Sequence, residues 1–143
     1  MDDEKYLSVN IVTPDGSKYS NDKVSMCLLR TLTGELGILP NHVPIIASLD
    51  IDQVKIKYGD KEDKIAVNGG FVEFSNNIAT IVADSAETED EIDLQRANKA
   101  KSEAENKINK AQSVNDSDEL KRAEVSLKKA INRINVASQK MNK

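Results

Sequence analysis

The side chains with the greatest potential for chemistry lie in the last third of the chain. The run IDLQRA, from Ile92 to Ala97, places Asp93 and Arg96 three residues apart. On a helix this spacing makes the two side chains neighbours, and a surface ion pair there is worth roughly 0.2–0.5 kcal/mol. Basic residues gather further along, at Lys121, Arg122, Lys128, Lys129, Arg133, Lys140 and Lys143. They form either a solvated face or a face that docks on an acidic protein surface or a polyphosphate.

Catalytic patterns are missing from the sequence. There is no GxxxxGK[ST] phosphate loop, and the carboxylates are scattered without a spacing that suggests paired acid–base work. The single histidine, His42, excludes a multi-histidine metal site. The single cysteine, Cys27, lies in VSMCLLRTL, where a buried or half-buried strand residue is favoured over a reactive thiol. We therefore expect no catalytic residue, no metal site and no enzymatic activity.

Composition limits the size of the core and the type of protein. Aromatic residues make up only 3% of the chain, so the core must be built from Val, Ile, Leu and Ala. A net charge of −4 argues against general nucleic-acid binding. The start MDDEKYL lacks a basic and apolar leader, so we expect no secretory signal. Two prolines interrupt the stretch GILPNHVPIIASL, so we expect no membrane span.

The first part of the chain has the pattern of β-strands. Apolar residues alternate with polar ones over Leu7–Ile11 and Val54–Tyr58, and Ile78–Val82 is a further short strand. Turn sequences such as PDG, SND, YGDKED and SNN separate these runs. Many short strands without helical segments between them predict an antiparallel β-sandwich or flattened barrel, which we place at residues 1–86.

The remainder, residues 87–143, has the pattern of a two-helix hairpin, so the chain as a whole is of the α+β class. Apolar residues recur every three or four positions in two stripes, which the polar connection SVNDSD separates. Thr88 with Glu91 and Asp116 with Glu119 fit capping boxes at the helix starts, and an acidic cluster would occupy the first turn of the first helix. The stripes comprise Ala97, Ala100, Ala104, Ile108 and Ala111, then Leu120, Ala123, Leu127, Ala130, Ile134 and Ala137.

Two properties suggest that this hairpin opens easily and binds acidic surfaces. Its first stripe is almost entirely alanine, which buries little apolar area and holds the helices together only weakly. The charge is also uneven, with 8 basic and 13 acidic residues in 1–86 but 12 basic and 6 acidic residues from Arg96 onward. A weak seam is what a conformational switch needs, although a marginally stable appendage would have the same pattern.

A loop-rich run with strong backbone constraints provides the most specific signature. It is GELGILPNHVP, from Gly34 to Pro44, where glycines supply unusual φ angles and prolines fix φ. Three further blocks accompany it: TPDG at Thr13–Gly16, IAVNGGF at Ile65–Phe71 and IDLQRA at Ile92–Ala97. In this order, over about residues 7 to 140, they make the chain resemble the epsilon subunit of bacterial rotary proton-translocating ATP synthases.

The resemblance implies a non-catalytic rotor subunit that serves ATP synthesis and proton transport. Its partners would be the gamma subunit, the membrane rotor ring and, through the C-terminal helix, the alpha and beta subunits of the headpiece. The hairpin would extend into the headpiece and inhibit ATP hydrolysis. The protein would lie at the cytoplasmic face of the plasma membrane, peripheral through the complex. No cofactor is implied, and ATP enters only as a regulatory ligand of the hairpin.

The resemblance also carries over site residues. Glu35 and His42 match the loop that faces the rotor ring. The matching positions for ATP recognition are Glu87, Ile92, Asp93, Arg96, Ala97, Arg122, Lys129 and Arg133. Two departures should weaken ATP binding. Lys129 stands where strong binders carry a third arginine, and lysine offers a point charge instead of a bidentate fork. Glu103 occupies a position that is basic in such binders.

One alternative of a different class stays open from the residues. A free-standing β-sandwich adaptor or ligand-binding module with a helical tail would show the same periodicities. An enzyme has no constellation to support it. Co-purification of gamma with the chain would separate a rotor subunit from a free-standing adaptor.

Overall fold

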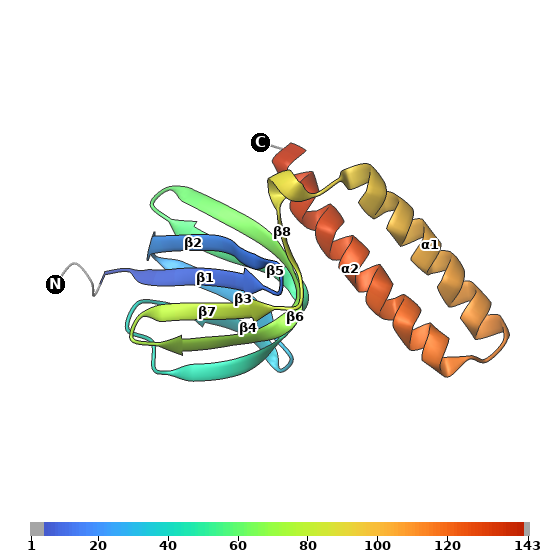
Figure 1. Ribbon diagram of the computed structural model, residues 1–143, viewed down its shortest axis with the longest axis horizontal. Coiled ribbons are helices and arrows are strands. Elements are labelled where there is room, and N and C mark those ends of the chain that lie inside the picture. Colours follow the sequence, from blue (N-terminus) through green and yellow to red (C-terminus); the bar gives the residue numbers. More distant parts are fainter. Residues whose placement is uncertain (1–4, 142–143) are drawn as a thin grey trace. The chain divides into compact units, whose positions relative to one another are not determined.

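The computed structural model describes residues 5–141, with side chains as far as residue 138. The chain divides into two compact units, Met1–Thr88 and Glu89–Lys143 (Figure 1). These units meet two residues after the boundary expected from the sequence. The reason is that Glu87 and Thr88 belong to a short strand that pairs within the sheet.

From residue 5 onward, the first unit consists of eight strands and has the sandwich fold expected from the sequence. The strands are β1 (Leu7–Thr13), β2 (Gly16–Val24), β3 (Met26–Thr31), β4 (Gly34–Ile38), β5 (Ile45–Tyr58), β6 (Lys61–Ser75), β7 (Ile78–Ala83) and β8 (Ala86–Thr88). Their order in the sheet is β2-β1-β7-β6-β5-β3-β4, with β8 paired to β6. All of these pairs are antiparallel except β1 with β7, which are distant in sequence and run parallel.

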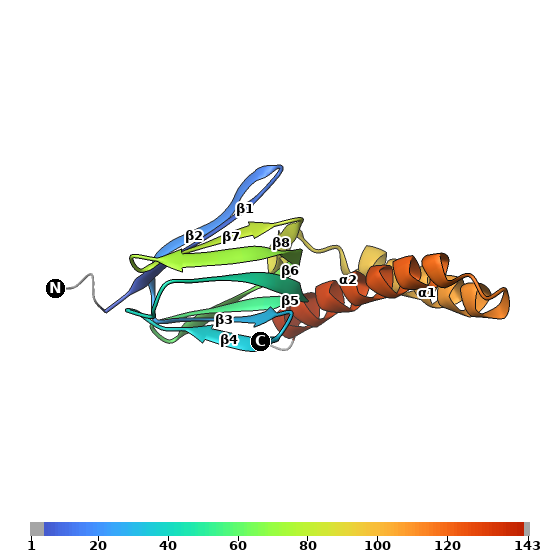
Figure 2. The same cartoon turned by 90° about the horizontal axis from the view of Figure 1, so that it is seen from below.

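The two long strands connect the layers of the sandwich. β5 and β6 pair along their whole length and curve together (Figures 1 and 2). Near the curve, both strands change which alternate positions face the core. Leu49 is buried before it on β5 and Val54 and Ile56 after it, whereas on β6 the buried set passes from Ile65 and Val67 to Val72 and Phe74. The core between the layers is mostly Val, Ile and Leu, as composition predicted, with Phe74 its largest fully buried side chain.

The glycine pair of IAVNGGF lies at this curve. Gly69 and Gly70 have φ angles of +86° and +122°. A Cβ atom on Gly70 would lie 2.1 Å from the carbonyl oxygen of Val82 and 2.8 Å from the Cα of Ala83. β7 therefore approaches β6 so closely that only glycine fits.

The second unit is a helical hairpin. It begins with the 3-10 turn η2 (Glu89–Glu91), followed by α1 (Leu94–Ser113) and α2 (Ser117–Met141). The expected capping box of Thr88 and Glu91 is wrong, because Thr88 ends β8 and α1 starts six residues later, at Leu94. The acidic residues Glu89–Glu91 consequently form the 3-10 turn, and α1 has no acidic residue in its first turn. Of the predicted basic set, the side chains of Lys140 and Lys143 lie outside the described residues.

The connection between the helices is short and well hydrogen-bonded. The backbone N–H of Asp116 donates to the carbonyl of Ala111 at 3.0 Å, and Asn115 takes the left-handed conformation with φ of 56°. This arrangement satisfies carbonyls at the end of α1. At the start of α2, the Asp116 carboxylate accepts from the N–H of Glu119 at 3.1 Å, so the predicted Asp116 cap is confirmed.

Alanines with a seven-residue spacing form the seam of the hairpin. The buried alanines are Ala97, Ala104 and Ala111 on α1, and Ala123, Ala130 and Ala137 on α2. The larger members of the predicted stripes, Ile108, Leu120, Leu127 and Ile134, are half-buried. A heptad spacing keeps one stripe facing the partner helix. Neither helix, over its described residues, is long and apolar enough to cross a membrane.

Candidate interaction sites on the sandwich and the hairpin

The run Gly34–Pro44 is part strand and part loop. Its first five residues form β4, the last strand at one edge of the sheet, and Leu39–Pro44 connect β4 to β5. Glu35, the second residue of β4, is opposite Arg30 on β3. His42 follows the other end of the strand. The two predicted ring contacts therefore flank the β4 edge and do not share one loop.

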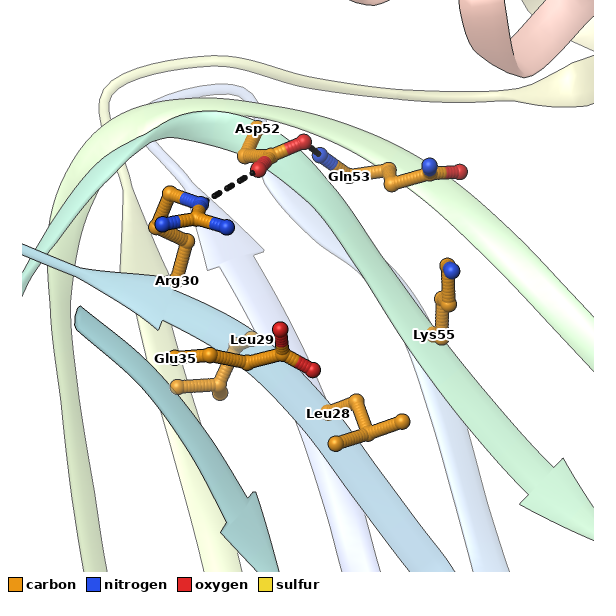
Figure 3. Close-up of a pocket in the computed structure, with 7 residues that line it drawn as sticks. All are labelled: Leu28, Leu29, Arg30, Glu35, Asp52, Gln53 and Lys55. Carbon is orange, nitrogen blue, oxygen red and sulfur yellow. Dashed lines mark hydrogen bonds and ion pairs between the residues drawn. The ribbon is translucent and has the colours of Figure 1, made fainter.

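Glu35 lines a shallow pocket of about 200 Å³ on the outer side of β3, β4 and β5 (Figure 3). Arg30 Nε donates to Asp52 Oδ2 at 3.0 Å across the same pocket, and Lys55 stands at its far side. The Arg30 and Asp52 side chains are 47% and 38% exposed, so their ion pair is solvated. Such pairs contribute about 0–1 kcal/mol. The pocket is thus a polar part of the surface with charges of both signs.

His42 is held by its neighbours and is only partly exposed. Its Nδ1 is 2.7 Å from the carbonyl oxygen of Val43, and its ring meets that of Phe74 edge-on, with centroids 5.9 Å apart. Phe74 is a fully buried core residue. The same loop carries two exposed apolar side chains, Leu39 at 52% and Val43 at 71%, and Asn41 between them is exposed as well. We call Leu39 and Val43 the apolar tip of this loop.

One outer side of the sandwich carries a group of exposed and half-buried apolar side chains that the sequence analysis missed. Phe71 on β6 is 41% exposed and pairs with Val82 on β7, and Val82 pairs with Val12 on β1. Ile46 on β5, 70% exposed, lies two residues from Ser48, the partner of Phe71, and so faces the same side. We call Val12, Ile46, Phe71 and Val82 the apolar face. The sequence signal for it was the pair Phe71 and Val72 in the run FVEF. Neighbouring residues of a strand point to opposite sides, so one of two adjacent apolar side chains must face outward.

In the IDLQRA block, Asp93 caps α1. Its carboxylate Oδ1 accepts a hydrogen bond from the backbone N–H of Arg96 at 3.1 Å, and its own backbone is extended, with φ of −87° and ψ of 104°. This is the geometry of a helix N-cap. The spacing that suggested a surface ion pair instead places the Asp93 carboxylate on the backbone of Arg96. The guanidinium of Arg96 is carried on an exposed side chain.

The other residues matched to ATP recognition differ in their surroundings. Ile92 is half-buried just before α1, whereas Ala97 is 3% exposed. Glu87 lies in β8, opposite Ala66 of β6, and so belongs to the sandwich unit.

The basic residues of α2 form one row along the helix. Arg122, Lys129 and Arg133 follow at spacings of seven and four, which keeps them on one side next to the alanine seam. At 1.5 Å per residue, Arg122 and Arg133 are about 16 Å apart along the axis. Arg122 is exposed and lies 4.0 Å from Glu119. The row is therefore extended and is not gathered around one point.

No group of three metal-ligating side chains occurs among residues 5–138, the part with described side chains. Cys27 is fully buried in β3, and burial raises its pKa to about 12. It is a core residue, as the sequence predicted. What the described surface offers is therefore docking: an apolar face, an apolar tip, a polar strand edge and a basic helix row.

Comparison with known proteins agrees with this picture. The family model described as ATP synthase, Delta/Epsilon chain, beta-sandwich domain matches residues 6–89, and the one for its long alpha-helix domain matches residues 90–138. The chain is similar to the ATP synthase epsilon chain of Pediococcus pentosaceus, at 58% identity over 96% of this chain and 99% of the relative. That of Levilactobacillus brevis is 57% identical over 95% and 97%.

Solved structures share the fold at low sequence identity. A chain of the Euglena gracilis mitochondrial ATP synthase, solved as OSCP/F1/c-ring, superposes with a TM-score of 0.77 at 21% identity, covering 97% of this chain and 82% of that one. A chain of the Tetrahymena thermophila central stalk and c-ring gives 0.52 at 18% identity, with 62% and 70% covered. Both architecture and sequence lead to one assignment. The chain belongs to the ATP synthase epsilon chain family, the bacterial non-catalytic subunits of the central stalk that serve ATP synthesis and proton transport.

Proposed function

We propose that the sandwich joins the gamma subunit to the membrane rotor ring, and that the hairpin inhibits ATP hydrolysis and is held folded by ATP. In this proposal the protein is peripheral to the cytoplasmic face of the membrane, where the rest of the complex holds it. The observation that supports it most is the contrast between the two units. One has a continuous aliphatic core, and the other is closed largely by alanines.

The apolar face is the surface best suited to gamma. Its central members come from three neighbouring strands, so they form a rigid surface of paired residues instead of a flexible loop. Phe71 is the largest of them, and aromatic residues are typical anchors of protein interfaces. Replacing Phe71 by Ser should weaken the gamma complex. Val125→Ser on α2, where the side chain is 43% exposed, provides a control of similar exposure outside the sandwich.

The rotor ring would run along the β4 edge. Glu35 and His42 lie near opposite ends of that strand, so one surface reaches both only by following the edge. The edge carries unpaired backbone groups, as every edge strand does, and these suit polar loops of a partner. The apolar tip at Leu39 and Val43 would add anchors at one end.

Inhibition requires that the hairpin opens and that α2 finds an acidic partner in the headpiece. An alanine side chain buries about three carbons fewer than leucine, at about 0.8 kcal/mol per carbon, so each alanine position closes the seam weakly. Lys121, Arg122 and Lys128 are exposed on α2. These charges would meet acidic side chains of the beta subunits when the helix extends.

Two variants of the complete complex test the inhibition. Deleting residues 89–143 should raise ATP hydrolysis, because the inhibitory helix is gone. Reversing Lys121, Arg122 and Lys128 to Glu should act similarly, whereas reversing the exposed Lys99, Lys107 and Lys110 of α1 should not. Normal assembly with unchanged hydrolysis in both the deletion and the α2 reversal would remove the inhibitory role.

For ATP, arginines are the best-suited groups. Arg96, Arg122 and Arg133 offer planar forks to phosphate oxygens, and Ile92 offers an apolar contact to the adenine. Ala97 is buried, so its methyl group would reach a ligand only if the chain around it opened. Because the row on α2 spans about 16 Å, a bound triphosphate would need side chains from distant turns to converge.

Calorimetric titration with ATP tests the sensor role. A ligand that binds only the folded hairpin stabilises it by about 2.7 kcal/mol at a hundredfold excess over Kd. Lys129→Arg should tighten binding because it adds a bidentate fork, and Glu103→Ala should tighten it by removing a repulsive charge. If neither heat nor chemical-shift change appears at millimolar ATP, the hairpin is governed by something other than ATP.

A further inference from the structure

The loop Leu39–Pro44 is tied to the turn between β6 and β7 by two reciprocal hydrogen bonds. The backbone N–H of Asn41 donates to Asn77 Oδ1 at 2.6 Å, and Asn77 Nδ2 donates to Asn41 Oδ1 at 3.1 Å. We call this pair the Asn41–Asn77 clasp. It joins residues 36 positions apart in sequence and uses both polar ends of the Asn77 amide.

The clasp rests on a rigid base. The carbonyl of Asn77 accepts from the backbone N–H of Ser8 at 2.8 Å, which fixes the turn to β1. Both asparagines adopt the left-handed conformation, Asn41 with φ of 69° and Asn77 with φ of 60°. Asparagine tolerates this conformation better than most residues do. Next to the clasp, the His42 ring rests edge-on against buried Phe74. Two anchors thus set the path of a loop whose tip stays exposed.

We propose that Asn77 is a positioning residue for the rotor-ring contact. It does not touch the ring itself but holds Leu39 and Val43 in the conformation in which they meet it. This inference rests on the proposed ring contact and specifies how the chain prepares for it. A loop that is already ordered loses less conformational entropy when it binds, so the clasp should raise affinity without adding a contact. His42 then supports the loop in addition to its proposed contact with the ring.

Glycine replacements provide the first test. Asn76, the other residue of the turn, has φ of 52°, so Asn77→Gly and Asn76→Gly each put glycine at a left-handed position and remove one amide. Only Asn77→Gly breaks the clasp. Each full-length variant is titrated into complexes that lack this subunit, and restored coupling of proton pumping to ATP hydrolysis is measured. We expect Asn77→Gly to need about tenfold more protein for half-restoration, because two hydrogen bonds are lost, and Asn76→Gly to match the parent.

Aspartate replacements test the geometry by rescue. Asn77→Asp keeps an acceptor for the Asn41 N–H, and a rotated Asn41 amide can donate to its second oxygen. Asn41→Asp keeps the acceptor for Asn77 Nδ2. Each single variant should therefore restore coupling within about twofold of the parent. The double variant Asn41→Asp with Asn77→Asp places two carboxylates against each other, so it should need about tenfold more protein for half-restoration of coupling. The double variant Asn41→Asp with Asn76→Asp has the same added charge and an intact clasp, and it should resemble the single variants.

Hydrogen exchange and thermal unfolding separate positioning from general damage. In free Asn77→Gly, the Asn41 amide should exchange faster while the melting temperature of the sandwich changes little. Coupling that is equal in Asn77→Gly and Asn76→Gly would overturn the inference. A different result would reject the proposed ring contact itself. In that case the double variant Leu39→Ser with Val43→Ser would leave coupling unchanged. A loss in that variant together with parental behaviour of Asn77→Gly would reject the clasp alone.

Discussion

Gly70 should be the position of the sandwich least tolerant of a methyl group. It pairs with Ala83 of β7 on one side and with Leu49 of β5 on the other, so backbone approaches it from both directions. A Cβ atom there would be 2.1 Å from the Val82 carbonyl oxygen and 3.0 Å from its carbonyl carbon. Both atoms belong to the backbone, so relief requires β6 and β7 to separate.

Gly16 provides a control with a similar φ angle. Its φ of +115° is close to the +122° of Gly70, but nothing lies within 4 Å of the point that a Cβ atom would occupy there. Alanine at either site has a similar conformational strain, of order 1–3 kcal/mol, and a similar reduction of unfolded-state entropy. The difference between Gly16→Ala and Gly70→Ala therefore isolates the steric overlap. Overpacking typically costs 1–3 kcal/mol, and a backbone overlap belongs at or above the upper end, about 3 kcal/mol.

The destabilisation caused by Gly69→Ala should lie between those of Gly16→Ala and Gly70→Ala. Its Cβ would be 2.9 Å from Asp84 Oδ2, the end of an exposed side chain that can rotate away. The expected order of destabilisation is Gly16→Ala, then Gly69→Ala, then Gly70→Ala. For a domain of this size, about 3 kcal/mol corresponds to a fall in melting temperature of about 12 °C or more.

The assay must report on the sandwich and not on the helices. Cys27 is suitable because it is fully buried in β3, and burial raises its pKa to about 12, so its thiol reacts only after the sandwich opens. Thiol labelling along a urea gradient at mildly alkaline pH gives the unfolding free energy of each variant. Equal midpoints for Gly70→Ala and Gly16→Ala would refute the steric argument and with it the account of the glycine pair.

Three further predictions concern other parts of the chain. Asp93→Ala should lower helix stability by about 1 kcal/mol, because the α1 cap is lost. Asp93→Asn keeps the hydrogen bond from the Arg96 N–H and should leave the stability unchanged, and thermal loss of helical circular dichroism measures both. A fragment ending at residue 88 should unfold cooperatively, whereas one ending at 85 lacks β8 and should melt earlier by calorimetry. Burial, together with Asp63, raises the pKa of Tyr19 in the folded protein. The protonated hydroxyl therefore stabilises the fold fully below the ordinary tyrosine pKa of about 10, and this stabilisation is lost as the pH rises further. Alkaline denaturation of Tyr19→Phe should therefore depend less on pH over that range.

Much of the fold could be predicted from the sequence because strands and helices follow from the periodic spacing of apolar residues. Leu7, Val9 and Ile11 are buried and alternate with half-buried Ser8 and Asn10, which is the predicted strand pattern. The alanine stripes are likewise where the helical period placed them. The spacing of apolar residues does not predict which distant strands pair. The parallel contact of β1 with β7 joins Ser8 to Ile78, far apart in sequence, and nothing local to either strand specifies its neighbour's direction.

The start of α1 shows a second limit. Thr88 and Glu91 have the spacing of a capping box, and Asp93 and Arg96 have the spacing of an ion pair, yet the structure uses Asp93 as the cap. Both patterns were compatible with local rules, and the choice was made by β8, which extends the sheet through Thr88. Tertiary pairing therefore overrode a local signal. Similarly, the clasp at Asn77 depends on a turn and a loop whose proximity is a product of the whole sandwich.

The distribution of apolar volume supports the proposal that one chain combines a fixed and a movable part. The sandwich is closed by Phe, Leu, Ile and Val side chains that are at most a few per cent exposed, and at about 1.5–3 kcal/mol each they stabilise one arrangement strongly. Apart from Val136, the buried apolar side chains of the hairpin are alanine methyl groups, which pack closely but contribute far less per position. In the proposed switch, a modest external free energy from a docking surface would open the hairpin while leaving the sandwich intact. The proposed switch depends on this weaker packing, because fully buried leucines in place of the alanines would raise the free energy needed to separate the helices.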